Sequence, residues 1–213
     1  MKDYYPFFLK GAGITIVIAF FAVIFGTVLG LLLSLMKLSE NKILRFIAGA
    51  YIEFVRGTPS LVQIWIVYLG LSNIGLNLPD LVTGIIALSL NSGAYVAEII
   101  RAGINSIDRG QKEAADSLGL TYRETMKSII LPQAIRNVLP ALSNEFITLL
   151  KETSVAGYIG IIELVKAADI IASGTYNYFF PLIIIAIIYL ILTIGLSKLL
   201  TIFEKKVLSH ARG

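Results

Sequence analysis

Long apolar stretches without a charged residue dominate the chain. A helix needs roughly 20 apolar residues to span the hydrocarbon core of a bilayer. Four stretches reach or approach that length, at residues 11–36, 57–79, 81–97 and 170–197. A fifth candidate, at residues 139–159, is interrupted by Glu145, Lys151 and Glu152. The pattern predicts an all-α integral membrane protein with five transmembrane helices, forming a single domain over residues 1–213.

The count of five rests on the distribution of Lys and Arg, which are enriched in cytoplasmic loops. With five spans, thirteen of the 18 basic residues fall on one side: after the first span, between the third and fourth, and in the tail up to Arg212. Four others fall on the opposite side and one at its boundary: Lys2, Lys10, Lys151, Lys166 and, at the boundary, Arg56. Four spans would mix the two groups, so we expect the N-terminus outside and the C-terminus in the cytoplasm.

Composition supports residence in a membrane and excludes several kinds of chemistry. The chain is 56% hydrophobic and 15% charged, whereas a soluble domain has about 25% charged residues. There is no cysteine, and the single histidine, His210, lies in the basic tail, so neither a thiolate metal site nor a hydrolytic triad is expected. The chain has no Gly-x4-Gly-Lys-Ser/Thr sequence to cradle phosphates. We therefore expect no enzyme, no metal, no cofactor and no nucleic-acid partner for this chain.

The polar segment between the third and fourth spans has the pattern of two short helices. Good helix formers fill residues 111–118, and Gly119 suits the left-handed position that ends a helix. Thr121 and Glu124 form a capping-box pair that starts a second short helix. We expect this second helix to end at Pro132, because proline interrupts the helical hydrogen bonds.

The first span carries small residues at four-residue spacing, Ala22, Gly26 and Gly30. Such a face lets another helix approach closely. The sequence leaves open whether that helix belongs to the same protomer or to a second subunit.

The cytoplasmic helix pair also carries a motif of fixed identities at fixed spacing: Glu113, Ala114, Ala115, Gly119, Ile129, Leu131 and Pro132. This run resembles the EAA signature of ABC-importer permeases. The resemblance implies a type I importer fold, in which a coupling segment at about residues 105–132 fits a groove of a cytoplasmic ATPase subunit. The alternative is an amphipathic helix on the membrane surface, but Ala114 and Ala115 are poor apolar anchors.

A second set of motifs is similar to the polar amino-acid permeases within that family. The matched residues are 56–59 and 61–63 at the start of the second helix, Tyr95, Ala97, Glu98 and Arg101 at the end of the third, and 151–154 after the fourth. Glu152 departs from the Asp or Asn that many members have there. The resemblance implies the permease subunit of an ATP-driven amino-acid importer in a bacterial plasma membrane.

Several partners follow from the resemblance. They are a cytoplasmic ABC ATPase dimer that binds ATP and Mg²⁺, a second permease copy that is identical or a close paralogue, and an extracellular or periplasmic amino-acid-binding protein. The permease itself would alternate access to a site near the midplane of the bilayer.

Polar and ionisable residues recur at helical spacing on three spans, which inside a membrane marks candidates for function. We expect a substrate site among Asn91, Ser92, Tyr95, Glu145, Thr148, Glu152, Thr153 and Ser154. Hydroxyl groups, with backbone amides near Gly93, suit an α-carboxylate, and the two glutamates suit ammonium groups, which favours a cationic amino acid slightly. The alternative for Glu145 is a structural residue that is protonated or paired with a lysine. Glu53 and Glu98 each precede an arginine by three residues and are expected in salt bridges.

Two other functions compete with this interpretation. An ion-coupled secondary amino-acid transporter would use Glu145 or Glu98 as a proton relay, but its usual inverted repeat is not visible in the sequence. A non-transporting scaffold or receptor subunit would have little reason to place Glu145 at the midplane.

Overall fold

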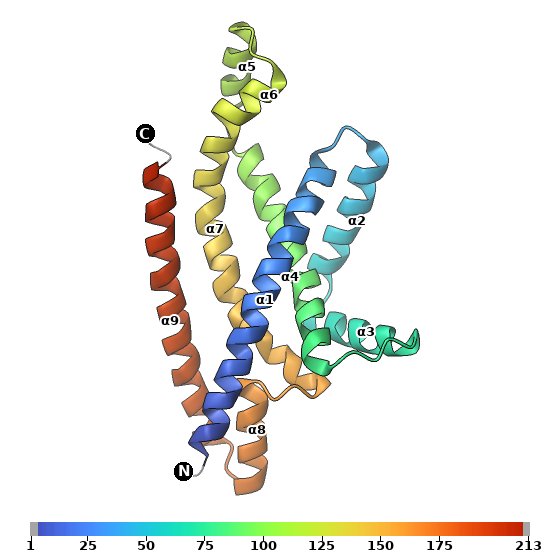
Figure 1. The fold of residues 1–213 in the computed structure, drawn as a ribbon, viewed down its shortest axis with the longest axis vertical. Helices are drawn as coiled ribbons and strands as arrows, with labels where there is room; N and C mark the ends of the chain where they lie inside the picture. The colour runs from blue at the N-terminus through green and yellow to red at the C-terminus, as the bar shows by residue number, and fades with distance from the viewer. Residues whose placement is uncertain (1–3, 211–213) are drawn as a thin grey trace.

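The computed structural model describes residues 4–210, and every regular element in that range is helical. Lys2 and Arg212, counted above among the basic residues, and the side chain of His210 lie outside the described part. Four long helices run along the long axis of the molecule (Figure 1): α1 (Tyr5–Leu38), α4 (Asp80–Asn105), α7 (Leu131–Glu152) and α9 (Phe179–His210). The shorter elements are α2 (Lys42–Gly57), α3 (Ser60–Asn73), α5 (Arg109–Ser117), α6 (Tyr122–Thr125), η1 (Met126–Ile130), η2 (Thr153–Ile159) and α8 (Leu164–Thr175).

Three of the described helices are long and apolar enough to cross a membrane, namely α1, α4 and α9. The bent pair of α2 and α3 makes a fourth if the two are taken as one span. Helix α7, which carries charged and amide side chains, is not in this set, so length and apolarity do not confirm the count of five.

The second span differs from the straight helix predicted over residues 57–79. The chain breaks at Thr58 and Pro59, and α2 and α3 meet there with a bend of 115°. Thr58 is extended, with ψ of 150°, because the proline ring disfavours a helical residue before it. As a result α3 crosses the direction of the long helices (Figure 1).

The last predicted span along the chain, residues 170–197, also differs from the prediction of one helix. That stretch contains the end of α8, a turn and the start of α9. Tyr176 has a left-handed backbone, with φ of 54°, and ends α8. The side chain of Asn177 then accepts a hydrogen bond from the backbone N–H of Phe180 at 3.4 Å, which starts α9.

The helix pair predicted between the third and fourth spans is confirmed in its first part and wrong at its end. Gly119 adopts φ of 74°, and Thr121 and Glu124 form the predicted capping box. The second helix does not stop at Pro132, because α6 continues through the π-helical segment η1 into α7. A proline clashes with the carbonyl group four residues earlier in an α-helix, and here that residue lies in the wider π turn.

The small-residue face of α1 packs against α4 of the same protomer. A Cβ atom on Gly26 would lie 3.0 Å from Ser92 Cβ, and one on Gly30 would lie 2.5 Å from Val96 Cγ1. Only glycine permits this approach, so the face serves packing within one protomer. It also fixes the position of Ser92, a residue of the predicted site.

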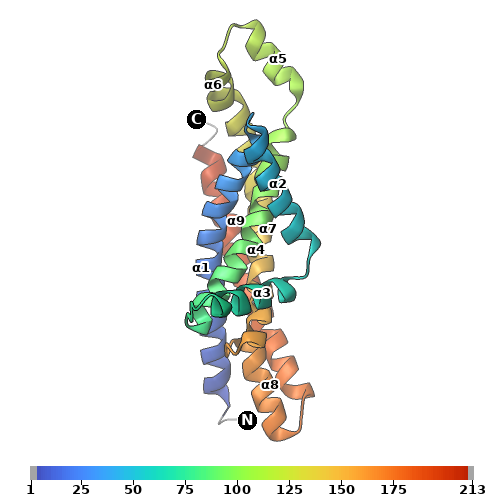
Figure 2. The same cartoon turned by 90° about the vertical axis from the view of Figure 1, so that its right-hand side faces the viewer.

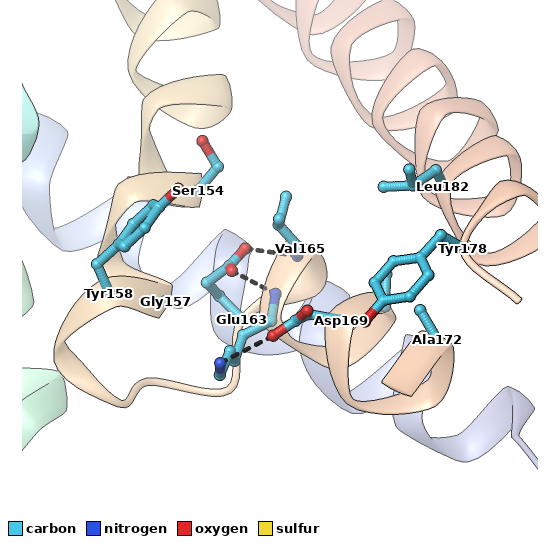
Figure 3. Close-up of a pocket in the computed structure, with 11 residues that line it drawn as sticks. Ser154, Gly157, Tyr158, Glu163, Val165, Asp169, Ala172, Tyr178 and Leu182 are labelled. Carbon is cyan, nitrogen blue, oxygen red and sulfur yellow. Dashed lines mark hydrogen bonds and ion pairs between the residues drawn. The ribbon is translucent and has the colours of Figure 1, made fainter. Parts of the chain in front are cut away.

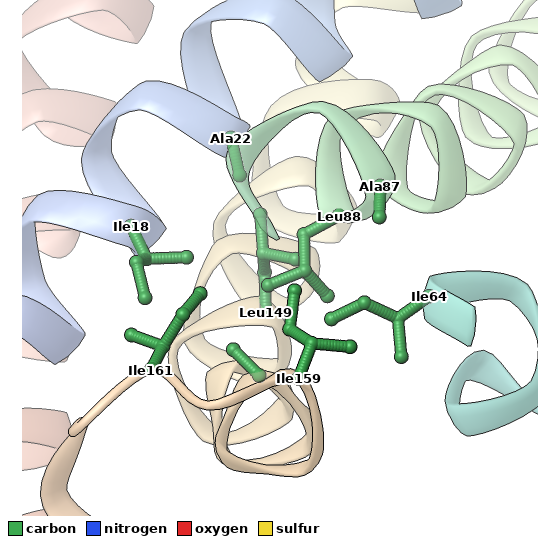
Figure 4. Packing of buried hydrophobic residues seen from close by; sticks show 9 residues of the cluster. Ile18, Ala22, Ile64, Ala87, Leu88, Leu149, Ile159 and Ile161 are labelled. Atoms are coloured by element: carbon green, nitrogen blue, oxygen red, sulfur yellow. The ribbon is translucent and has the colours of Figure 1, made fainter. Parts of the chain in front are cut away.

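A buried apolar cluster joins α1, α3, α4, α7 and the segment from η2 to α8 (Figure 4). Its members are Ile18, Ala22, Ile64, Ala87, Leu88, Leu149, Ala156, Ile159 and Ile161. The cluster holds together the helices that carry the predicted site residues.

Candidate functional site

Side chains of α4 and α7 meet through the predicted site residues. Ser92 is completely buried, and its Oγ donates a hydrogen bond to Oε1 of Glu145 at 3.3 Å. Glu145 and Glu152 are both half-buried and lie close enough for their charges to interact. Two carboxylates on one helix face, within electrostatic range of each other, favour a cation near them. This arrangement is the strongest candidate for a ligand site in the described residues.

Tyr95 extends the same region toward α2. The guanidinium carbon of Arg56 lies 5.9 Å from the centre of the Tyr95 ring, and Tyr95 is within electrostatic range of Glu145 and Glu152. Arg56 also lies 3.9 Å from Glu98. The site is therefore bordered by a cationic group on the α2 side.

Asn91 contacts α3. Its Nδ2 donates to Oε1 of Gln63 at 2.9 Å, and both side chains are buried. Gln63 belongs to the motif matched at residues 61–63 and lies outside the predicted substrate site.

Of the other predicted site residues, Thr148 lies on the same face of α7 as the two glutamates, whereas Thr153 and Ser154 contact other groups. Thr148 is exposed on α7, and Thr153 is buried with its hydroxyl donating to the carbonyl oxygen of Leu150 at 2.9 Å. Ser154 lines a different cavity of about 310 Å³, formed by η2, α8 and the start of α9 (Figure 3).

The predicted salt bridges are confirmed for both acids: Glu98 pairs within its own helix, and Glu53 pairs with another helix. Glu98 accepts a hydrogen bond from Nε of Arg101 at 2.9 Å, three residues later. Glu53 instead lies 4.0 Å from Nζ of Lys37 on α1. The side chain of Glu53 is largely exposed.

A buried acid that the sequence analysis missed lies between η2 and α8. Glu163 has no exposed surface, and its carboxylate accepts hydrogen bonds from the backbone N–H groups of Val165 and Lys166, at 2.8 and 2.7 Å (Figure 3). Tyr189 of α9 donates to the same carboxylate at 3.4 Å. The signal was an ionisable residue flanked by apolar residues on both sides.

The predicted coupling residues divide into an exposed and a buried set. Helix α5 projects beyond the end of the long helices (Figure 2), and Glu113, Ala114 and Gly119 are exposed there. Ala115 is buried and faces the protein. The remaining predicted residues lie in η1 and at the start of α7: Ile129, Leu131 and Pro132. Part of the motif therefore forms surface, and part shapes the turn that presents it.

No group of three or more acidic or histidine side chains that could hold a metal ion occurs in the described part of the chain. The site consists of hydroxyl, amide and carboxylate groups, which suit an organic ligand with N–H donors.

Comparisons with known proteins give a consistent picture. Residues 22–209 match the family described as "binding-protein-dependent transport system inner membrane component". The chain is 46% identical over 203 residues to a putative glutamine transport system permease protein, GlnP, of Rickettsia bellii, covering 95% of this chain and 93% of that protein. It is 45% identical over 206 residues to the arginine transport system permease protein ArtQ of Bacillus subtilis, covering 96% and 94%.

Solved structures agree with these relatives. A crystal structure of an amino acid ABC transporter with histidines shares 50% identity with this chain and a TM-score of 0.90, covering 97% of this chain and 96% of that one. The inward-facing MetNI methionine ABC transporter shares the fold, with a TM-score of 0.73 at 19% identity and 99% coverage of both chains.

Proposed function

The chain belongs to the family of binding-protein-dependent transport system inner membrane components, and on that premise we propose that it forms the substrate pathway of an ATP-driven importer of polar amino acids. It is a permease subunit of an amino-acid ABC importer, in keeping with its relatives. The alternative of an ion-coupled secondary transporter has no support from the family or the relatives.

The observation that carries the choice of site is the pair of half-buried glutamates on α7, of which Glu145 accepts a hydrogen bond from Ser92 of α4 and Glu152 lies seven residues further on. Ser92 holds the Glu145 carboxylate, which leaves its other oxygen open to an ammonium or guanidinium group. Relatives named for glutamine and arginine share the same general size and polarity of substrate. The two negative charges favour arginine, and the site alternates its access between the two sides of the membrane.

We place five spans in a single domain over residues 1–213, with α2 and α3 forming one broken span and α7 the remaining one. Broken helices that line a substrate pathway are common in transporters. Helix α1 begins at one end of the molecule, whereas α9 ends toward the end that carries α5 and α6 (Figure 1), as an odd number of crossings requires. Together with the basic residues, this supports an N-terminus outside and a C-terminus in the cytoplasm of a bacterial cell.

The coupling segment, at about residues 105–132, is the proposed contact with a cytoplasmic ATPase dimer, which binds ATP and Mg²⁺. One continuous path leads from α5 through α6 and η1 into α7, the helix that bears Glu145 and Glu152. A displacement of α5 is therefore transmitted along the backbone to both carboxylates. A second permease copy and an external amino-acid-binding protein complete the proposed importer.

Replacing either glutamate of the pair tests the site. In Glu145→Gln and Glu152→Gln variants we expect arginine binding to the permease–ATPase complex to weaken by about tenfold or more, since a hydrogen-bonded charge contributes roughly 1.5–3 kcal/mol. The measurement is equilibrium binding of radiolabelled arginine and glutamine, with Glu40→Gln in an exposed loop as the matched control. Unchanged affinity for both amino acids in both variants would refute the assignment.

A further inference from the structure

Gln63 lies at the break between α2 and α3, in the first turn of α3, and its side chain is only 7% exposed. Its Nε2 donates to the carbonyl oxygen of Val55 at 2.7 Å. It also lies 2.9 Å from both the carbonyl oxygen and the hydroxyl of Thr58. A single side-chain amide thus contacts both sides of the break.

These contacts replace backbone hydrogen bonds that the break removes. In a continuous α-helix the carbonyl of Val55 would accept from the N–H of residue 59, but that residue is Pro59 and has none. Past the break, the backbone N–H groups of Val62 and Gln63 both donate to the carbonyl of Pro59. The carbonyl of Thr58 therefore has no backbone donor from Val62 and accepts a hydrogen bond from the Gln63 side chain instead. A buried carbonyl without a partner is costly, so the amide stabilises the bend.

The same contacts fix which way the Gln63 amide points. Because two of its neighbours are carbonyl oxygens, which only accept, the nitrogen must face the break and Oε1 must face α4. Oε1 then accepts from Nδ2 of Asn91 at 2.9 Å. The orientation of Asn91 is therefore set by the break.

Asn91 is left with its oxygen as the available group. Asn91 is 4% exposed, and among the described residues its Oδ1 has no hydrogen-bond donor, which is rare for a buried polar atom. The next residue, Ser92, holds Glu145. Two adjacent residues of α4 thus carry a buried amide oxygen without a donor and a hydroxyl that binds the Glu145 carboxylate.

We propose that Gln63 is a positioning residue for transport: it holds the α2–α3 break and orients Asn91 so that Asn91 Oδ1 accepts an N–H group of the amino-acid substrate. This inference rests on the proposed function and names a residue that acts through another. Gln63 itself does not touch the substrate, because both ends of its amide are occupied.

A double-mutant cycle tests the inference. The variants are Gln63→Met, Asn91→Ala and the double substitution, in the permease purified with its ATPase. We measure the Kd of radiolabelled arginine and glutamine, with the exposed Asn73→Ala as control for the Asn substitution. Each single substitution is expected to raise Kd about tenfold, and the double variant to be no weaker than the weaker single variant.

Additive effects in the double variant, or wild-type affinity in Gln63→Met or in Asn91→Ala, would overturn the inference. A Glu145→Gln variant in the same series distinguishes failure of the Gln63 inference from failure of the proposed substrate site. If Glu145→Gln weakens amino-acid binding while the Gln63 results contradict the inference, the proposed site is retained and only the role of Gln63 is rejected. If thermal unfolding shows that Gln63→Met does not fold, the cycle is run with Gln63→Glu. That variant keeps the length of the side chain but cannot serve both carbonyl groups, and the same outcomes decide.

Discussion

Glu163 shows how a single buried carboxyl makes stability depend on pH. It lies in the connection between η2 and α8, outside the proposed spans, and burial raises its pKa to about 6 against the opposing effect of two backbone N–H groups. The folded protein therefore binds this proton more tightly than the unfolded chain does. The resulting stabilisation is fully present below about pH 4.5 and is lost as the pH rises through about 6.

A Glu163→Gln variant is expected to remove this pH dependence, because the amide does not titrate. Between about pH 4.5 and pH 7, Glu163 is expected to lower the free energy of unfolding of the unsubstituted protein by about 2 kcal/mol, because its pKa is raised from 4.5 to about 6. Thermal unfolding of the purified protein between pH 4.5 and 7 measures it, with the exposed Glu40→Gln as control. If the stability of Glu163→Gln changed with pH as much as that of the unsubstituted protein, other groups would set the pH dependence.

At the residue scale, the sequence predicted the contact partners unevenly. The polar stripes at helical spacing placed Ser92 and Glu145 in one candidate site, but the hydrogen bond between them was not predicted. Gln63 and Glu163 were missed as anchors, because their partners are backbone groups exposed by a break and by a helix start. Such partners exist only after the local structure is known.

The coupling segment is the clearest test at the scale of elements. Gly119 links α5 and α6 with φ of 74°. A residue with a Cβ atom is strained in this left-handed conformation by roughly 1–2 kcal/mol. No atom lies within 4 Å of the place of a Cβ at Gly119, so a larger side chain meets open space and would protrude from the surface proposed to contact the ATPase.

We therefore expect Gly119→Leu to lower ATPase binding or substrate-stimulated ATP turnover severalfold while the membrane fold is retained. Gly70→Leu is the matched control, because it lies inside α3, also has open space around it, and is far from the coupling segment in the chain. Co-purification and ATP turnover are the measurements. Full binding together with full stimulated turnover in Gly119→Leu would contradict the coupling role.

Elements were predictable where one local signal dominated. The capping box at Thr121 and the left-handed Gly119 are properties of a few neighbouring residues, and both were correct. Pro132 was predicted to end a helix, yet the chain passes through Pro132 and instead bends at Pro59, where no break was predicted. The difference lies in the preceding backbone: extended Thr58 in one case and a π turn in the other.

At the scale of the whole molecule, the distribution of charge and the arrangement of helices agree. The segment with the densest basic charge, residues 101–136, lies at one end of the molecule and comprises the end of α4, the projecting helices α5 and α6, and the start of α7 (Figure 2). Helix α7 runs from that end past Ser92 of α4. The all-helical architecture was predictable from apolar stretches, whereas α7, which carries charged and amide side chains, does not stand out by hydropathy.

The central claim is that this subunit is the conduit of an ATP-driven amino-acid importer whose motor lies on another chain. The most direct measurement is uptake of labelled arginine and glutamine into liposomes that contain the purified complex with its external binding protein. The account predicts uptake that requires ATP on the ATPase side and is reduced about tenfold or more by Glu145→Gln. Uptake that proceeds at full rate without ATP and follows an ion gradient would contradict it.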